Sequence, residues 1–443
     1  MSKIVTVVVS RQTTPIKEAS FSIPCLFTNE APEDITFNTS TSRSYTGDDD
    51  GLTAVGEDFG TGSDTYKAVQ SLLGQTNKVS EFRIFLRDDV VAKVKTITFS
   101  GSVLTGQTIN GTVNGTALTS TAFNTDVATT LGAVATKIDA VEGVASATVV
   151  GNVITVTATA EWDLSLTSFV VTGAGTLPTA TIGTTTAGHT QADDIATANT
   201  ENKDWYVMLS TSVDKGAILC SAAAIQGLTK IAFFNSADSD IPTNTAGNVL
   251  AKLKANSYDR TALLYTHDSA EFSACAWAGR HLPFKPGKTI FALKTLAGVT
   301  VDETMTSTHF GNILNNNGNV YLEELGKNLV KEGKMVNGDY IDIIRNLDYV
   351  TSQLVLRLFN LITSDEIFTY MDENVGRADS VMREFFFEAY QGGIMRDNYK
   401  TTVPKVSSIP VNIRANRHLP DIPFEFELQG AIQSMAISGV AKV

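Results

Sequence analysis

The residues best suited to nucleotide binding lie about two thirds of the way along this 443-residue chain. Pro286-Gly-Lys-Thr289 contains the Gly-Lys-Thr of a phosphate-binding loop, which would present a lysine to phosphate oxygens. A Walker loop also needs a glycine five residues before Gly287, and that position holds Leu282. We therefore predict a Pro-Gly turn leading into a strand from Thr289 to Leu293, and no Walker loop.

A second candidate site is acidic. Asp48-Asp-Asp-Gly51 opens like a calcium loop, but the fifth and twelfth positions counted from Asp48 are Leu52 and Phe59. Neither side chain can coordinate calcium through oxygen. The segment is predicted to be a solvated acidic loop.

The histidines and cysteines show no catalytic or metal-binding spacing. No HExxH, GxSxG or CxxC motif is present, and the histidines are expected at the surface or in loops. The cysteines lie in apolar contexts and are predicted to be reduced core residues. We therefore predict no catalytic residue, no cofactor and no metal, and interpret the chain as not an enzyme. The residues concerned are His189, His267, His281, His309, His418, Cys25, Cys220 and Cys275.

The elements around these residues alternate between strand and helix. Such alternation predicts a parallel sheet with covering helices, an α/β fold. The expected strands are Glu81–Arg87, Trp205–Leu209, Lys230–Asn235 and Thr261–Thr266, and the expected helices are Thr190–Lys203, Lys215–Gln226, Ala246–Ala255 and Ser269–Gly279.

A module of different composition interrupts this alternation. Residues 96–190 contain 25 threonines and only six charged side chains. Short β-branched runs, at Thr96–Phe99, Gln107–Asn110, Ala147–Val150 and Asn152–Thr157, are separated by turns expected at Asn110-Gly111, Asn114-Gly115 and Gly151-Asn152. One amphipathic helix is predicted from Thr125 to Val141, capped by Asn124 or Thr125. The module is therefore predicted to be a mostly β domain inserted in a strand-to-helix connection.

Bulk composition excludes some partners. A formal charge of −13 and a pI near 4.9 argue against nucleic-acid or anionic-membrane binding. No stretch is long and apolar enough for a transmembrane helix, and the start of the chain favours a strand over a signal peptide. We expect a soluble protein made in a cytoplasm, without membrane insertion.

The last third is predicted to hold two long helices and then strands. Asp339 opens a helix in which Ile344, Leu347, Thr351, Leu354, Leu358 and Leu361 form a stripe that we expect to be buried along its whole length. A second helix, Ala378–Tyr390, carries Val381, Phe385 and Ala389 on one face and ends at Gly392-Gly393. Strands are expected at Ser408–Ile413, Phe424–Leu428 and Ile432–Val443.

In its sequence motifs the chain resembles the contractile tail sheath family of bacteriophages and related injection machines. The resemblance covers residues 200–443 and, more loosely, the helix and strand between Thr65 and Leu86. No single motif is diagnostic of the family; the order and spacing of the whole set of motifs are. The motifs are Asp259-Arg-Thr-Ala-Leu-Leu-Tyr265, Leu296-Ala-Gly-Val299 after a Pro-Gly turn, Asn317-Gly-Asn-Val-Tyr321, Gly338-Asp-Tyr-Ile-Asp342, Ile413-Arg-Ala-Asn-Arg417, Ile422-Pro-Phe-Glu-Phe-Glu-Leu428 and Gly430-Ala-Ile432.

The resemblance implies a non-enzymatic subunit that polymerises around a tail tube and contracts to drive the tube through the host envelope. It implies a virion protein assembled in the host cytoplasm, with other sheath copies, the tube protein, and baseplate and tail terminator proteins as partners. The implied organisation is an N-terminal arm (1–20), a discontinuous α/β core (21–95 and 188–317), a β-rich decoration domain (96–187) and a C-terminal sheath domain (318–443).

The resemblance also implies that subunits exchange terminal strands. Both ends of the chain are β-prone and would be open edges in a monomer, although each could pair within its own subunit. The arm residues are Ile4, Val5, Val7, Val9, Ile432, Met435, Ile437, Val440 and Val443. Three alternatives stay open: another virion tail or capsid component, an α/β hydrolase-like enzyme with dispersed catalytic residues, and a surface adhesin.

Overall fold

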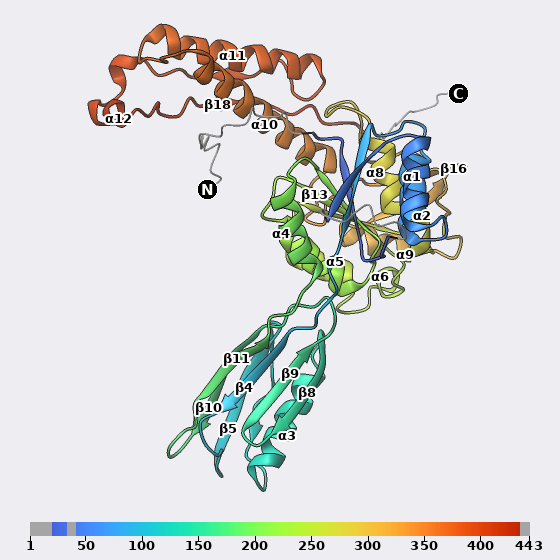
Figure 1. The fold of residues 1–443 in the computed structure, drawn as a ribbon, viewed down its shortest axis with the longest axis vertical. Coiled ribbons are helices and arrows are strands. Elements are labelled where there is room, and N and C mark those ends of the chain that lie inside the picture. Colours follow the sequence, from blue (N-terminus) through green and yellow to red (C-terminus); the bar gives the residue numbers. More distant parts are fainter. Residues whose placement is uncertain (1–19, 33–40, 435–443) are drawn as a thin grey trace, which may run out of the picture.

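The computed structural model describes residues 20–32 and 41–434. Figure 1 shows an α/β body with one unit projecting from each end: the Thr-rich module below, and a pair of long helices above. Among the described residues, no helix combines the length and apolarity needed to cross a bilayer.

The body is built on an eight-stranded sheet in the order β16-β15-β14-β13-β12-β1-β3-β2. Its six inner strands are parallel, and β2 and β16 pair antiparallel at the two edges. The predicted parallel sheet is thus confirmed. The strands are β1 (Pro24–Thr28), β2 (Ser42–Thr46), β3 (Glu81–Leu86), β12 (Val207–Ser210), β13 (Ile231–Ser236), β14 (Thr261–Tyr265), β15 (Asn319–Glu324) and β16 (Lys327–Lys331).

Helices cover both faces of the sheet, because the inner strands are apolar on both sides. In β1, Leu26 packs into one core while Cys25 and Phe27 pack into the other. The first face is covered by α1 (Asp49–Phe59), α2 (Asp64–Leu73) and α8 (Ser273–His281). The second is covered by α4 (Gln191–Glu201), α5 (Lys215–Ile225), α6 (Asp240–Thr243), α7 (Val249–Ala255) and α9 (Ser307–Asn315), and a short 3-10 turn, η2 (Ser269–Glu271), precedes α8.

Two local predictions in the body are wrong. The acidic run after Asp48 is the start of α1, because the Asp48 carboxylate accepts a hydrogen bond from the Gly51 amide at 3.0 Å and caps the helix. Thr289–Leu293 forms no strand: Leu293 has φ +58°, so the segment makes isolated backbone hydrogen bonds to β16 instead of a ladder. The Pro-Gly turn before it is confirmed by Gly287, with φ +81°.

The Thr-rich module folds as two four-stranded antiparallel sheets around a separate apolar core. Strand β4 is the first strand after the body strand β3, and β11 is the last before α4, so the module lies in a strand-to-helix connection. One sheet contains β5 (Gln107–Val113), β6 (Thr116–Ala117), β7 (Thr121–Ala122) and β10 (Leu166–Gly173), and the other β4 (Val94–Phe99), β8 (Val144–Val150), β9 (Val153–Ala158) and β11 (Ala180–Thr186), with helix α3 (Val127–Asp139) beside β8.

Two details of the module differ from the predictions. Asn110-Gly111 lies inside β5 and is not a turn; the Phe169 ring packs against Gly111 so closely that a Cβ there would meet it at 2.4 Å. The hairpin turn falls at Asn114-Gly115, where both residues have positive φ. Helix α3 is capped by Asp126, which accepts from the Thr129 amide at 2.7 Å, and not by Asn124 or Thr125.

The body extends further along the chain than predicted. Strands β15 and β16 belong to the large sheet, so the expected boundary after residue 317 is wrong. Strand β15 joins because its parallel pairing with β14 buries Val320 and Leu322 in the second core. The C-terminal unit begins within the long helix α10, whose first turn still packs on the body through Ile341 and Ile344.

The C-terminal unit is a helical pair crossed by irregular chain. It contains α10 (Ile341–Ser364), α11 (Asp372–Gln391), β17 (Lys400–Thr401), η3 (Val406–Ser408), α12 (Val411–Ala415) and β18 (Phe424–Glu425). The predicted strand at Ser408–Ile413 is wrong: Pro410 has no backbone donor for a sheet ladder, and it is the N-cap of α12, where the chain turns into a helix. The predicted strand Phe424–Leu428 is reduced to β18 and one bridge between Met395 and Leu428.

Candidate assembly site

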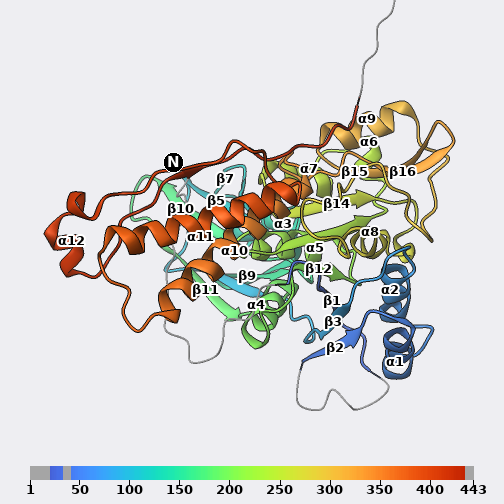
Figure 2. The same ribbon diagram turned by 90° about the horizontal axis from the view of Figure 1, so that it is seen from above.

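The helical pair α10–α11 is held together by its own small core. Phe386 is fully buried at its centre, with the Tyr399 and Phe424 rings 5.5 Å away and the Phe426 ring 6.1 Å away. The last two rings come from the returning segment after α12. Figure 2 shows that segment running back along α11 towards the body. This core therefore fixes the path of the chain towards its C-terminal end.

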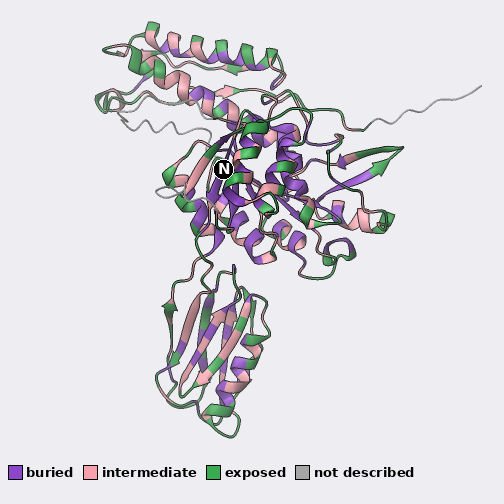
Figure 3. Ribbon diagram, turned by 45° about the vertical axis from the view of Figure 1, so that its right-hand side comes forward, coloured by how far each residue is buried: buried purple, intermediate pink, exposed green. Residues whose placement is uncertain are grey.

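The stripe on α10 is buried only in part. Ile344 and Leu354 are buried, but Leu347 is 39% exposed and Thr351 is also exposed. Beyond Leu354 the stripe residues are only half-buried, so the expectation of burial along the whole helix is wrong. The reason is geometric: the first turns pack on the body, whereas the rest packs only in the small core that α10 shares with α11 and the chain after it (Figure 3).

Large apolar side chains remain uncovered on the C-terminal unit. Exposed apolar patches on soluble proteins mark interaction sites. The exposed residues are Leu347, Ile362, Ile367, Met371, Phe387, Tyr390 and Val411, followed by Ile432 on the segment that leaves the unit. This set makes the unit the first candidate for contact with other chains.

Most of the predicted arm residues lie outside the described residues. These are Ile4, Val5, Val7, Val9, Met435, Ile437, Val440 and Val443. Ile432 is described; it is 81% exposed and lies in no strand. Its neighbourhood shows where the arm leaves the body.

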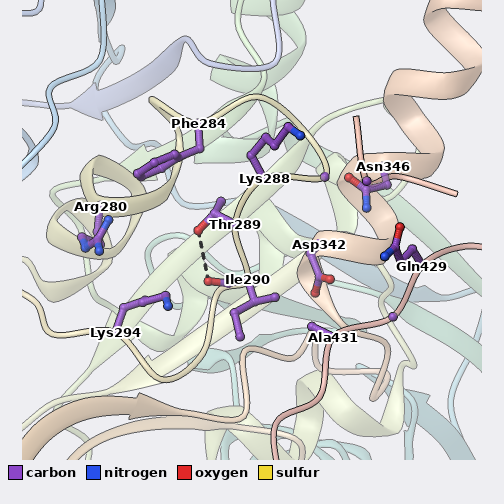
Figure 4. A pocket seen from close by; sticks show the side chains of 13 residues that line it. Arg280, Phe284, Lys288, Thr289, Ile290, Lys294, Asp342, Asn346, Gln429 and Ala431 are labelled. Atoms are coloured by element: carbon purple, nitrogen blue, oxygen red, sulfur yellow. Dashed lines mark hydrogen bonds between the residues drawn. The ribbon is translucent and has the colours of Figure 1, made fainter. Parts of the chain in front are cut away.

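That exit lies beside a pocket of about 490 Å³ between the body, α10 and the returning segment. Figure 4 shows side chains from three parts of the chain converging there: Lys288 and Lys294 from the loop after the Pro-Gly turn, Asp342 and Asn346 from α10, and Gln429 from the returning segment. Lys288 of the rejected phosphate loop is thus a pocket residue. The pocket therefore combines positively charged side chains from the loop with hydrogen-bond acceptors from the helix.

Two buried polar residues of α10 line this pocket, and one of them has an acceptor without a protein partner among the described residues. Asp342 is 8% exposed, and burial raises the pKa of its carboxyl above the ordinary range. Asn346, one turn further along, is 3% exposed, and its Oδ1 accepts no hydrogen bond within the described part of the chain. Buried acceptors are normally satisfied, so this pocket has capacity for donors from another segment.

A buried arginine connects α10 to the body and to the start of the described chain. Arg345 is 1% exposed and donates to the carbonyls of Phe21 (2.9 Å), Leu282 (3.2 Å) and Phe284 (2.7 Å). Burial lowers the pKa of its guanidinium to about 10. One turn further on, the Asp348 carboxylate accepts from the Tyr206 hydroxyl at 2.8 Å and pairs with Arg260.

The sequence interpretation missed these polar residues because it followed only the apolar stripe. The signal was present, since Asp342, Arg345 and Asp348 recur at three-residue spacing in the first turns of the helix. Charges at that spacing share one side of a helix. Here that side faces the body.

The histidines and cysteines are distributed differently from the predictions. His281 is fully buried against the Phe291 ring, with centroids 4.6 Å apart, and is not a surface residue. His189 is partly buried where the inserted module joins the body. Cys25 and Cys275 are buried free thiols, whereas Cys220 is free but partly exposed.

Comparison with known proteins rests on structure alone, because no family model and no curated protein matches this chain. The helical sheath of the anti-feeding prophage in its contracted state matches with a TM-score of 0.55 and 10% identity over 99% of each chain. A chain of the anti-feeding prophage baseplate matches with a TM-score of 0.53 and 10% identity, over 100% of this chain and 99% of the other.

This chain has the contractile sheath fold. The coverage is nearly complete, so the match includes the inserted module as well as the body and the C-terminal unit. A sheath tail protein from Desulfitobacterium hafniense is also similar, with a TM-score of 0.48 and 10% identity over 89% of this chain and 93% of the other. The fold class and the resemblance predicted from the last third of the sequence are both confirmed.

Proposed function

We propose that this chain is the structural subunit of a contractile sheath, which polymerises around a tail tube and contracts to drive the tube through a target envelope. The observation that carries the proposal is the sheath fold over the whole chain, shared with sheath and baseplate assemblies of the anti-feeding prophage. In this proposal, the energy for contraction is stored in the difference between two packings of one chain, and no nucleotide is consumed. A non-enzymatic role follows from this mechanism.

The exposed apolar residues of the C-terminal unit support an assembly function. Phe387 and Met371 are more than half exposed, and Ile367 is three-quarters exposed. Each would be buried by a neighbouring chain. At about 25 cal/mol per Å² of apolar area, repeated contacts of this kind add up to a stable polymer.

Terminal strand exchange completes the proposal. The N-terminal arm, including Ile4, Val5, Val7 and Val9, and the C-terminal arm, from Ile432 to Val443, would each complete a sheet in neighbouring copies. The pair β17–β18 supports this, because each strand pairs only with the other among the described residues and has an edge available. Backbone hydrogen bonds of the added strand would contribute about 0.5–1.5 kcal/mol each.

The proposed setting is a bacteriophage tail or a related injection machine, assembled in the host cytoplasm. The expected partners are other copies of this chain, the tail tube protein, and the baseplate and tail terminator proteins. The inserted module, which projects from the end of the body opposite the helical pair, is proposed to decorate the outer surface (Figure 1).

Negative-stain microscopy of the concentrated, purified protein tests the proposal. A sheath subunit should form wide hollow tubes. Another virion component, an α/β hydrolase or an adhesin should not, and discrete particles at every concentration would contradict the proposal.

A matched pair of variants tests the C-terminal arm. Deleting Met435 to Val443, or replacing Ile437 by proline to remove a backbone donor, should abolish tubes and leave a folded monomer. Ile437→Val keeps the donor and should still form tubes. A folded truncation that polymerises would exclude this arm as the connector, and an unfolded one would place the strand in its own subunit.

A further inference from the structure

The two chain segments that connect the inserted module to the body lie side by side. Val91 and His189 pair as an isolated antiparallel bridge, with N–O distances of 3.0 and 2.8 Å. Figure 1 shows the module attached to the body through these narrow connections. Any group that binds both segments would therefore control how rigidly the module is held.

A buried ionic cluster lies at this junction. Arg87, at the end of β3, donates to Asp194 of α4 at 2.9 Å and to Glu161 of the inserted module. All three side chains are at most 6% exposed. Glu161 also accepts from the Gln191 amide at 2.9 Å, so the module, α4 and β3 share one network.

The cluster has more negative than positive charge. Asp88 follows Arg87 and adds a third carboxylate, with its Oδ2 4.0 Å from Nε2 of His189. Two buried carboxylates, Glu161 and Asp194, face the single guanidinium of Arg87, while Asp88 is 77% exposed. The two buried carboxylates exceed the charge of Arg87 by one, and the low dielectric of a buried place makes that excess costly.

Three side chains bring ligand atoms together at this point. One carboxylate oxygen each from Asp88 and Asp194 and one ring nitrogen of His189 all lie within 4.8 Å of one another. Nε2 of His189 is 2.7 Å from Oδ1 of Asp194 and 4.0 Å from Oδ2 of Asp88. Bonds of about 2.0–2.1 Å to a tetrahedral zinc ion place ligand atoms about 3.3 Å apart. The two distances to His189 bracket this value, and all three ligand atoms lie within 4.8 Å of one another, so adjustments of at most about 1.5 Å would bring them to one ion.

We propose that Asp88, His189 and Asp194 form a binding site for a divalent transition metal ion of the zinc type. An imidazole with two carboxylates suits such an ion, whereas calcium needs six to eight oxygen ligands. Asp88 is 77% exposed, which opens the fourth coordination position to water. The ion would neutralise the excess charge and join both connecting segments to α4.

Zinc titration of the full-length protein after treatment with a chelator tests this proposal. Isothermal calorimetry should show one site per chain, and zinc should raise the midpoint of thermal unfolding. His189→Ala and Asp88→Asn should each weaken binding by more than the roughly 10–100-fold that follows loss of a group supporting a ligand. Circular dichroism confirms that both variants fold; Asp194 is left intact because the buried Arg87 depends on it.

His267→Ala is the matched control. His267 lies 3.5 Å from Asp302 in a histidine–aspartate pair on the body, and no third ligand group completes a set there within the described residues. This variant should bind zinc like the parent. Zinc binding that is unchanged in His189→Ala and Asp88→Asn, or no binding by the parent, would overturn the proposal and leave a simple His189–Asp194 ion pair.

Discussion

The guanidinium of Arg345 donates a hydrogen bond to the carbonyl of Phe21 across 2.9 Å, although the two residues are 324 positions apart. Phe21 itself packs against the Tyr206 and Tyr349 rings, at centroid distances of 4.8 and 5.7 Å. The place where the N-terminal segment enters the body is thus tied to the helix that carries the C-terminal unit.

Replacing Arg345 by methionine should lower the free energy of unfolding by at least about 2 kcal/mol, because several buried carbonyls would lose their donor. Arg357→Met is the control: its ion pair with Glu388 is partly exposed, and its loss should cost less than about 1 kcal/mol. Urea denaturation measures both. An equal loss in the free energy of unfolding for both variants would show that the buried hydrogen bonds of Arg345 stabilise the protein no more than an exposed ion pair.

Alanine substitutions along α10 should destabilise the protein at its buried positions and have little effect at its exposed ones. Ile344→Ala and Leu354→Ala each remove a buried side chain and should cost roughly 2–5 kcal/mol. Leu347→Ala should cost less than about 1 kcal/mol in the monomer, because the side chain is 39% exposed. Thermal melts of the three variants are the measurement, and a large loss in Leu347→Ala would place that residue in the core.

Excision of the inserted module should leave a folded body. A Cβ added at Gly188 would lie 3.0 Å from Cα of Lys93, so the ends are close enough for a short Gly-Ser bridge in place of residues 94–187. The excised protein loses Glu161, one of two carboxylates on Arg87, and should be less stable by about 1.5–3 kcal/mol.

Glu161→Gln in the full-length chain measures that loss separately. Circular dichroism and urea denaturation of both proteins decide the matter. An excised protein that is unfolded, beside a stable Glu161→Gln variant, would show that the module is integral to the body.

Acid should destabilise the body through His281. Burial, with help from the positive charges of Arg280, Arg345 and Lys294, holds the pKa of this imidazole well below its ordinary value of 6.5. Below about pH 6.5 the unfolded chain therefore takes up a proton that the folded chain does not, and stability falls by up to about 1.4 kcal/mol per pH unit.

His281→Phe keeps a ring against Phe291 and removes this proton uptake. Urea denaturation between about pH 5 and pH 7 should show a shallower decline for this variant than for the parent. The exposed His418→Phe change serves as control and should keep the parent slope. Identical slopes in all three proteins would exclude His281 as the acid-sensitive group.

Local sequence patterns determined which segments form most helices and strands. Apolar residues at alternate positions, as in Phe82 and Ile84, and at three- and four-residue spacing, as in Leu131, Val134 and Ile138, reflect burial on one side, and each lies in a buried core. Composition alone identified the inserted module and its place in the chain. These features depend on neighbouring residues, so one sequence is enough to predict them.

Only the tertiary structure decided what each face packs against. The stripe on α10 has one period throughout, yet Ile344 meets the body, Leu347 meets solvent and Leu354 meets α11. Partners brought together from distant positions also turned Thr289–Leu293 into an irregular segment beside β16 and grouped Arg87, Glu161 and Asp194 at one junction. Periodicity indicates that a side chain is buried. The residue it packs against depends on how the helices and strands are arranged, and that arrangement is encoded by the whole chain.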